Sequence, residues 1–285
     1  MVFFVVMLIG NAIWLSLSPI DVDILSYGPA YAIIALGGVL YLIYKYKRPD
    51  YNIMTLLSAA LFFLLATNIL SITSYLMTSL PLPLRDAWFN GFDLWLGFNF
   101  NRVLLLTNGN EWAAKILPLF YHSSLFQMIL IVLLLAALKP AKLIEFCRLY
   151  LIIICITFII ALLLPAMGPY DYLNVVPQSL ANLGEHTGRL HIKTIEALRA
   201  GGDFTISFTS ITGLVTFPSF HTALALLVPY ALRDYKWLCI LAIAVNVIVL
   251  IATVPIGGHY LTDILGGILL TVSVILATKK PDLNE

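Results

Sequence analysis

The stretch WLCILAIAVNVIVLIATVPI, residues 237–256, holds twenty consecutive residues without a charged side chain. A helix of about 20 apolar residues is long enough to cross the hydrocarbon core of a bilayer. Seven further apolar segments lie along the chain, and their approximate bounds are 1–18, 25–44, 53–79, 113–137, 143–166, 216–232 and 259–278. The chain is therefore predicted to be an all-α polytopic membrane protein with about eight transmembrane helices.

The overall composition supports a membrane protein. Hydrophobic residues make up 61% of the chain and charged residues 11%, with a mean hydropathy of +0.96, whereas soluble domains carry about 25% charged residues. A net charge of +1 leaves no basic stripe to neutralise phosphates, which argues against a nucleic-acid partner. The three cysteines lie in or beside apolar runs without a C-x-x-C pair, so neither a disulfide nor a thiolate metal site is expected. No cofactor is predicted.

The basic residues of the short connections predict the topology. They follow every second apolar segment, so the positive-inside rule places these connections and both termini in the cytoplasm. The connections 19–24, 80–112, 167–215 and 255–258 are then extracytoplasmic, and the protein is expected in a plasma or inner membrane. The basic residues concerned are Lys45, Lys47, Arg48, Lys139, Lys142, Arg233, Lys236, Lys279 and Lys280.

Two of the outer connections are long. Residues 82–102 mix tryptophan, phenylalanine and leucine with charged side chains, which is typical of an interfacial helix that lies on the outer leaflet. Residues 167–215 contain two histidines, two glutamates and several basic residues. Because loops of this length in compact proteins are usually functional or disordered, this connection is a candidate part of a binding site.

A first polar cluster, PSFH at 218–221, begins the segment 216–232 on its outer side. The backbone N–H groups of a first helical turn, together with the Ser219 hydroxyl, could seat an anion that His221 faces. The alternative is that Ser219 only caps the helix and His221 reaches to the membrane interface.

A second polar cluster, GGHYLTDILGG at 257–267, also begins a helix on the outer side. His259 and Asp263 are four residues apart, so they share one face of a helix. A carboxylate that accepts a proton from one imidazole nitrogen leaves the other nitrogen free as nucleophile or base. The alternative is a structural His–Asp bond that steadies the turn.

Both clusters fall at the outer ends of neighbouring helices, and coincidence is a poor explanation for that. Ionisable residues entering a membrane indicate function. An enzyme site is one interpretation, and a proton-coupled transporter that uses His221, His259 and Asp263 as a relay is the other. The transporter would need ionisable residues through the membrane centre, where the last three segments are apolar.

The two clusters resemble the second and third motifs of the type 2 phosphatidic acid phosphatase superfamily. The resemblance covers roughly residues 160–270 and implies a six-helix core within 51–285, including the outer loops 80–112 and 167–215, after two accessory helices in 1–50. It implies that His259 attacks phosphorus to form a phosphohistidine, that Asp263 orients His259, that His221 protonates the leaving group and that Ser219 binds phosphate. No metal is implied.

The sequence departs from the usual family pattern in several places. Phe220 stands in place of a glycine, and the serine–arginine pair of the third motif is replaced by Ala252 and Thr253. The first motif is missing, and LLPAMGPY (163–170) stands in its place, which makes Tyr170 a candidate substrate-binding residue. The pattern is more similar to the branch of fungal inositol phosphorylceramide synthases and their bacterial relatives, which are phosphotransferases.

The function predicted from these observations is that of a membrane phosphohydrolase or phosphotransferase acting on a lipid phosphoester at the outer membrane face. Water as acceptor gives hydrolysis, and an alcohol or lipid hydroxyl gives transfer; both remain open, as do the lipid and the oligomeric state. Since the family arginine is absent, Arg199 is predicted to bind the phosphate as a bidentate donor, with Lys193 and Arg189 as weaker candidates. The alternative is that Arg199 is a solvated loop residue.

Overall fold

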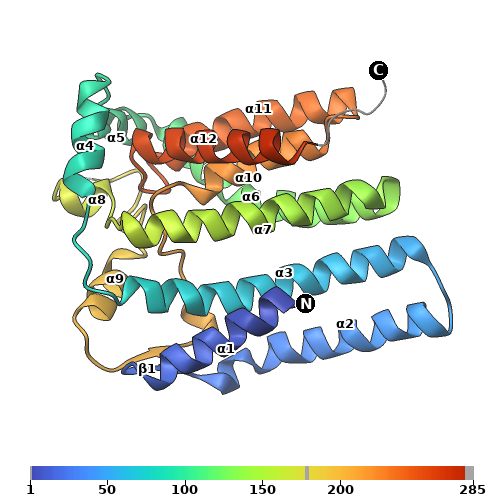
Figure 1. Ribbon diagram of the computed structural model, residues 1–285. Coiled ribbons are helices and arrows are strands. Elements are labelled where there is room, and N and C mark those ends of the chain that lie inside the picture. Colours follow the sequence, from blue (N-terminus) through green and yellow to red (C-terminus); the bar gives the residue numbers. More distant parts are fainter. Residues whose placement is uncertain (1, 177–179, 280–285) are drawn as a thin grey trace. The chain divides into compact units, whose positions relative to one another are not determined.

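The computed structural model describes residues 2–176 and 180–279 of the 285-residue chain, and most of them are helical (Figure 1). An α-helix overlaps each of the eight predicted apolar segments, with bounds that differ by a few residues. These helices are α1 (Val2–Ser16), α2 (Gly28–Tyr46), α3 (Tyr51–Thr78), α6 (Glu111–Leu138), α7 (Pro140–Leu163), α10 (Phe220–Ala231), α11 (Lys236–Thr253) and α12 (Leu261–Thr278). The predicted all-α polytopic membrane fold is confirmed.

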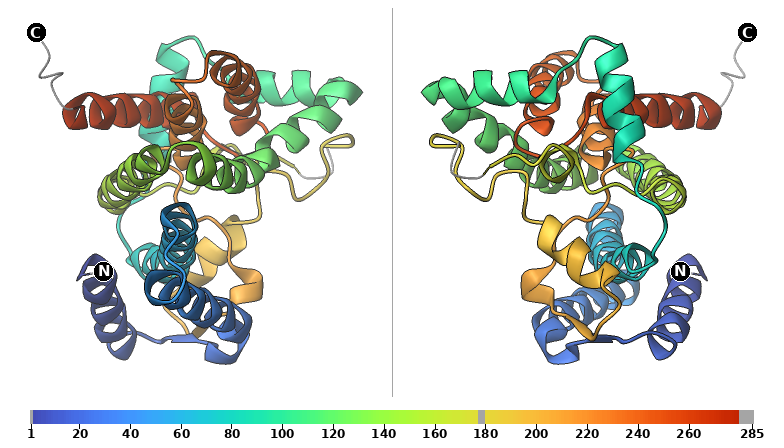
Figure 2. Two further views of the ribbon diagram at one scale, coloured as in Figure 1. Left: turned by 90° about the vertical axis from the view of Figure 1, so that its right-hand side faces the viewer. Right: turned by 90° about the vertical axis from the view of Figure 1, so that its left-hand side faces the viewer.

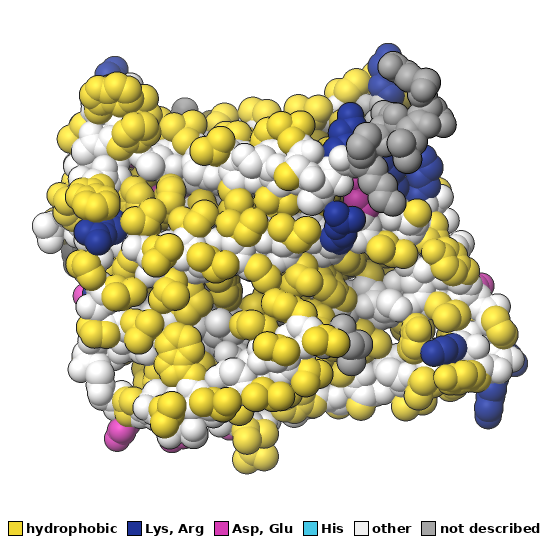
Figure 3. Space-filling model, in the orientation of Figure 1, with side chains coloured by type: hydrophobic (Ala, Val, Ile, Leu, Met, Phe, Trp, Pro, Cys, Tyr) yellow, Lys and Arg dark blue, Asp and Glu magenta, His cyan; other side chains and the backbone are white. Residues whose placement is uncertain are grey.

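Within the described residues, six helical segments are long and apolar enough to cross a membrane, and α1 and α10, with 15 and 12 residues, are shorter. The long segments expose apolar side chains: Leu241 of α11 is 61% exposed and Leu269 of α12 is 70% exposed. Hydrophobic side chains also cover most of the face shown in Figure 3. Apolar surface of this extent needs a lipid environment, so the chain is an integral membrane protein.

The smaller elements lie in the connections between the apolar helices. Two short strands, β1 (Ile20–Val22) and β2 (Phe204–Ile206), pair in parallel with Ile20 opposite Phe204. The other elements that the structure describes are the 3₁₀ turns η1 (Ile24–Tyr27) and η3 (Phe208–Ser210) and the helices α4 (Asp86–Trp95), α5 (Phe100–Gly109), α8 (Pro169–Tyr172) and α9 (Ile192–Arg199).

The chain forms two compact units. Unit 1 comprises residues 1–83, 129–147 and 190–214, and unit 2 comprises residues 84–128, 148–189 and 215–285. These units group segments by contact and not by role in a reaction. The division of the chain at residue 50 into accessory helices and an enzymatic core therefore stays a prediction.

Unit 1 is built around α3, along which α1 and α2 both pack (Figures 1 and 2). Polar side chains join α1 to α3: the Asn11 amide donates to the Ile69 carbonyl at 2.9 Å, and the Thr73 hydroxyl donates to Asn11 Oδ1 at 3.0 Å. Such interhelical hydrogen bonds stabilise helix contacts in lipid, where apolar burial contributes little. The polar residues of this part of α3 thus have a structural role.

Unit 2 contains α10, α11 and α12, and α10 packs against both of the other two. Gly267 permits the close approach of α12 to the start of α10, because a Cβ atom at this position would lie 2.6 Å from the Ser219 carbonyl oxygen and 2.9 Å from Thr222 Cβ. The Ser219 N–H also donates to the Asp263 carbonyl at 3.0 Å. The two polar clusters of the sequence are therefore joined directly through the backbone.

The predicted interfacial segment 82–102 is not a single helix, because it holds α4 and the first three residues of α5. α4 ends at Trp95, Gly97 adopts a positive φ of 76°, and the Asn99 side chain caps the start of α5 by accepting from the Arg102 N–H. A residue with positive φ ends a helix readily when it is glycine. Both tryptophans of α4 are exposed, Trp88 by 62% and Trp95 by 76%, whereas Phe89 is buried.

Candidate active site

The first pair of the candidate site is His259 and Asp263. His259 lies in the turn before α12, and Asp263 lies in the first turn of that helix. His259 Nδ1 is 3.0 Å from Asp263 Oδ2, and the same oxygen accepts the Tyr260 N–H at 3.0 Å. His259 is buried, and Asp263 is completely buried. The spacing of four residues thus brings imidazole and carboxylate together, with the carboxylate fixed by the backbone of its own helix start.

Burial controls the charge of the imidazole. It lowers the pKa of His259 from its ordinary value of 6.5 to about 4, and a hydrogen bond with the Thr216 backbone opposes part of this lowering. A buried histidine disfavours its cationic form because the charge would lose its hydration. His259 is therefore neutral at physiological pH, which is the state that a nucleophile or a base requires.

Ser219 caps α10. Its side chain accepts the Thr222 N–H at 3.3 Å, and the residue is 1% exposed. A hydroxyl that accepts one hydrogen bond still has its own proton to donate. The capping role and a contact to an anion are therefore compatible, although the sequence presented them as alternatives.

His221 lies in the first turn of α10 and packs against a tyrosine of α6. The Tyr121 ring stacks on the imidazole with centroids 4.3 Å apart, and the Tyr121 hydroxyl lies 3.3 Å from His221 Nδ1. Two aromatic rings in this geometry restrict each other's rotation. Tyr121, which is 100 residues away in the sequence, thus orients His221.

Tyr121 also connects the two histidines in space. A Cβ atom on Gly257 would lie 2.9 Å from Tyr121 Cε2 and 3.0 Å from His259 Cδ2, so both rings flank this glycine. Because Tyr121 also stacks on His221, all three rings border one small region. The structure therefore brings His221, His259 and Asp263 together with Ser219, whose N–H bonds the Asp263 backbone.

Tyr170 supports the turn before His259. Its hydroxyl donates to the Pro255 carbonyl, and the residue is 1% exposed. The backbone of Gly188 lies against Gly258, where an added Cβ atom would be 2.5 Å from the Gly188 oxygen. Next to Gly188, the Arg189 guanidinium lies 5.7 Å from the centre of the Tyr170 ring and donates to the Val175 carbonyl.

The other two predicted phosphate donors lie on α9 in unit 1. The Arg199 guanidinium donates to the carbonyls of Leu80 and Leu82 at 3.1 and 2.6 Å, and Lys193 is exposed. Thr253, at the position of the family arginine, donates its hydroxyl to the Val249 carbonyl at 2.8 Å. Two donors of Arg199 are thus engaged within unit 1, and the Thr253 hydroxyl is engaged within its own helix.

Sequence reasoning missed two buried carboxylates of α4. Asp86 accepts hydrogen bonds from the N–H groups of Met167 and Gly168 and from the Tyr260 hydroxyl. Asp93 accepts from both the N–H and the hydroxyl of Thr262, and from the Leu261 N–H. The sequence feature that could have indicated them is their separation of seven residues, which places both carboxylates on one face of a helix, away from Trp88.

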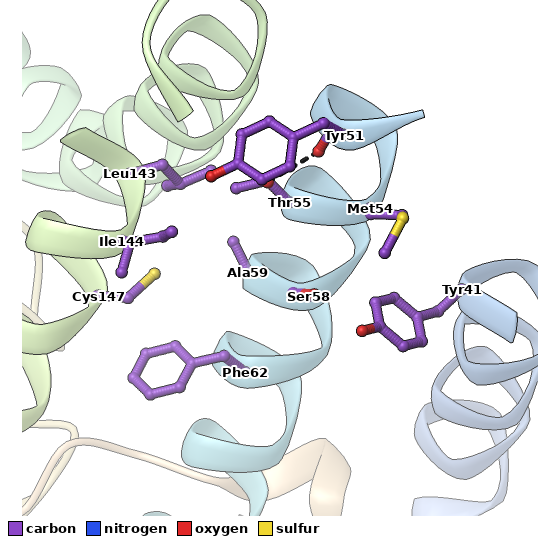
Figure 4. Close-up of a pocket in the computed structure, with 10 residues that line it drawn as sticks. All are labelled: Tyr41, Tyr51, Met54, Thr55, Ser58, Ala59, Phe62, Leu143, Ile144 and Cys147. Atoms are coloured by element: carbon purple, nitrogen blue, oxygen red, sulfur yellow. Dashed lines mark hydrogen bonds between the residues drawn. The ribbon is translucent and has the colours of Figure 1, made fainter. Parts of the chain in front are cut away.

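The described residues contain no metal cluster, and they form a cavity away from the predicted site residues. Within residues 2–176 and 180–279, no group of three His, Cys, Asp or Glu side chains could hold a metal ion. A cavity of about 280 Å³ lies in unit 1 between α2, α3 and α7 (Figure 4), and none of the predicted site residues lines it. Its lining is Tyr41, Tyr51, Met54, Thr55, Ser58, Ala59, Phe62, Leu143, Ile144 and Cys147.

Comparison with known families identifies the chain. Residues 87–277, which are about two thirds of the sequence, match the model of the PAP2 superfamily. The chain therefore belongs to the PAP2 superfamily, whose members are generally phosphatases or phosphotransferases acting on phosphoesters. The matched range includes every residue of the cluster around His259. No curated protein and no solved structure shows a significant match to the chain.

Proposed function

We propose that this protein is a membrane phosphohydrolase or phosphotransferase that acts on a lipid phosphoester through a phosphohistidine on His259. The observation that carries the proposal is the buried His259–Asp263 pair, whose helix start is bonded through the backbone to Ser219. His221 lies two residues after Ser219, in the first turn of α10, and its ring stacks on Tyr121, which also flanks Gly257 beside His259. This cluster supplies a neutral nucleophile, an orienting carboxylate, a hydroxyl donor and a second imidazole.

The proposed reaction has two steps. In the first, the His259 nitrogen that is not bonded to Asp263 attacks phosphorus; a P–N bond forms, the P–O bond to the lipid breaks, and His221 gives its proton to the departing oxygen. In the second, an acceptor oxygen attacks phosphorus, His221 takes the acceptor proton, and the P–N bond breaks with its electron pair returning to His259. Dividing the transfer in this way replaces one difficult step with two easier ones.

The charge of the phosphoryl oxygens needs a cationic partner. Arg189 is now the favoured donor in this proposal, because it follows Gly188, whose backbone lies against Gly258 beside His259. Arg199 stays the second candidate, since a guanidinium has five N–H donors and two serve Leu80 and Leu82. Lys193 is the third.

The acceptor defines the class of enzyme. Water gives a phosphatase, whereas a lipid or sugar hydroxyl gives a transferase of the kind that inositol phosphorylceramide synthases represent. The resemblance of the whole motif pattern to that branch, with Phe220, Ala252 and Thr253 in place of the usual residues, favours transfer. We place the site on the extracytoplasmic side, with both termini in the cytoplasm, on the distribution of basic residues.

A transporter is the less favoured function. Along α10, α11 and α12, the Asp, Glu, His, Lys and Arg residues are limited to His221, Lys236 and Asp263, all in first turns. A proton relay would need further ionisable groups towards the middle of these helices. Asn246 of α11, which is polar and buried, donates to Gln127 and to the Ala242 carbonyl and thus has a structural role.

The test is an assay of purified protein in detergent against a panel of lipid phosphates, with and without alcohol acceptors, scoring free phosphate and new phosphodiester. His259→Ala should abolish turnover, because it removes the covalent step. Enzyme quenched during turnover of a phosphomonoester should carry acid-labile, alkali-stable phosphate. His186→Ala is the matched control, since this histidine is exposed, and it should keep wild-type turnover. Retention of more than a few per cent of kcat by His259→Ala would refute the phosphohistidine.

A further inference from the structure

Helix α4 has an unusual distribution of side chains. Its two carboxylates are buried, Asp86 with 4% exposure and Asp93 with 2%, while Trp88 and Trp95 are among its most exposed residues. Carboxylates are almost never buried to this degree unless they are paired. Each aspartate is satisfied by hydrogen bonds from uncharged donors.

Asp93 holds the start of α12. Its Oδ2 accepts the Leu261 N–H at 2.9 Å, and its Oδ1 accepts the Thr262 N–H at 2.8 Å and the Thr262 hydroxyl at 2.5 Å. The first N–H groups of a helix have no partner within the helix, and a carboxylate there also interacts favourably with the helix dipole. Asp93 therefore caps the Leu261 and Thr262 N–H groups from another helix, beside the Tyr260 N–H that Asp263 accepts within the start of α12 itself.

Asp86 holds the residue before that helix. Its Oδ1 accepts the Tyr260 hydroxyl at 3.0 Å and the Gly168 N–H at 2.8 Å, and its Oδ2 accepts the Met167 N–H at 3.0 Å. Tyr260 is completely buried, so its ring and hydroxyl have a single position. Asp86 thus ties this position to the turn that follows α7.

The two aspartates together restrain one continuous stretch of chain. Tyr260, Leu261 and Thr262 are the three residues between His259 and Asp263, and each of them donates at least one hydrogen bond to an α4 carboxylate. The distance from imidazole to carboxylate depends on the conformation of this stretch. A shift of α4 relative to it would therefore change the His259–Asp263 geometry.

We propose that Asp86 and Asp93 are positioning residues, which hold the three residues between His259 and Asp263 and thereby fix the nucleophile and its orienting carboxylate. The expected loss of kcat rests on the function proposed above. The expected change in the His259–Asp263 geometry does not depend on any activity. Neither aspartate touches the reacting atoms, and both act through the backbone and the Tyr260 side chain.

Asn is the informative substitution at both positions. Both oxygens of each aspartate accept N–H or O–H donors, so in either orientation an asparagine would direct its NH₂ group at another donor. Asp93→Asn and Asp86→Asn therefore lose hydrogen bonds without a change of side-chain volume. Asp203→Asn is the matched control, because Asp203 is exposed.

The experiment measures the rate at which diethyl pyrocarbonate modifies His259, by peptide mass spectrometry of the full-length protein in detergent, beside kcat and KM. Buried, bonded His259 should react slowly in the wild type. In both Asn variants the modification rate of His259 should rise about 10-fold, while the exposed His186 keeps its modification rate. The kcat of both variants should fall about 10- to 100-fold with KM within about threefold, because small misplacements of reacting groups are costly. A global loss of folding would instead raise the modification rates of the half-buried His191 and His221 as well.

The outcomes separate this inference from the proposed function. Wild-type values of the His259 modification rate in both Asn variants would overturn the positioning role, whatever the kinetics show. If wild-type protein turns over no phosphoester, the proposed function fails, but the modification rates still decide the role of Asp86 and Asp93. A rise confined to His259, with Asp203→Asn unchanged, would establish it.

Discussion

Replacement of Gly267 by alanine should damage the site by separating the two helices that carry it. Gly267 lies in α12, where an added Cβ atom would be 2.6 Å from the Ser219 carbonyl oxygen and 2.9 Å from Thr222 Cβ. The nearest atom belongs to the backbone, so no flexible side chain can move aside. Because the Ser219 N–H is bonded to the Asp263 carbonyl, any shift of one helix start is a shift relative to the other.

The size of the effect follows from these distances. Cβ atoms essentially never approach closer than 3.0 Å, so the helices must separate by at least about 0.4 Å, which is 3.0 minus 2.6. Overpacking costs about 1–3 kcal/mol, and the gain in helix propensity from glycine to alanine is about 1 kcal/mol. The net destabilisation is then about 1 kcal/mol, a decrease in Tm of about 2–4 °C.

The same displacement should have a larger proportional effect on kcat than on the free energy of unfolding. If a displacement of 1 Å can cost about 100-fold in rate, 0.4 Å corresponds to roughly a 5- to 10-fold loss of kcat. The assay is turnover of a lipid phosphate in detergent, with thermal unfolding of the same preparation. Gly38→Ala in α2 is the control, since nothing lies within 4 Å of a Cβ atom there, and it should keep wild-type kcat and an equal or higher Tm. If Gly267→Ala behaves like Gly38→Ala, the close approach of α10 and α12 does not hold the site together.

Three further predictions concern the chemistry and the topology. His221→Ala should reduce turnover of a lipid phosphate far more, by about 100-fold, than turnover of a nitrophenyl phosphate, whose leaving group needs little protonation; an equal loss on both would assign His221 to binding. Burial lowers the pKa of His259 to about 4, so the ring is neutral above that pH. Turnover of nitrophenyl phosphate should therefore persist down to about pH 5 and fall as the pH drops through about 4. A fall in turnover centred near the ordinary pKa of 6.5 would contradict a buried nucleophile. Cysteines placed at Asn182 and Asp234 should react oppositely with an impermeant thiol reagent added outside, with position 182 labelled; the reverse pattern would move the site to the cytoplasmic side.

The sequence was sufficient to predict the features that depend on local pattern. All eight apolar segments contain helices, because long uninterrupted apolar runs have no other stable structure in lipid. The spacing of four between His259 and Asp263 also indicated their contact, which is 3.0 Å. The contact does not come from a shared helix face, since His259 precedes α12 and Asp263 lies in the first turn of that helix. Both features nevertheless arise within one short stretch of chain.

Other features could not be predicted because they join distant parts of the chain. Tyr121 contacts His221 across 100 residues, and Asp86 contacts Tyr260 across 174. No periodicity in one sequence encodes which pairs meet over such separations. The division of 82–102 into α4 and α5 was missed for a local reason, since the aromatic pattern continues past Gly97, where the positive φ ends the first helix.

The parts of the site differ in how they are held. The Ser219 N–H to Asp263 carbonyl bond and the contact at Gly267 join α10 to α12 through backbone atoms, so the spacing between Ser219 and the His259–Asp263 pair is fixed by helix packing. The segment that contacts this rigid pair near Tyr170 and Gly188 is instead a long connection, and loops tolerate variation better than packed helices. We therefore expect substitutions at Arg189 to change which phosphoester and which acceptor are used, and substitutions at α10 or α12 to change the rate for every substrate alike.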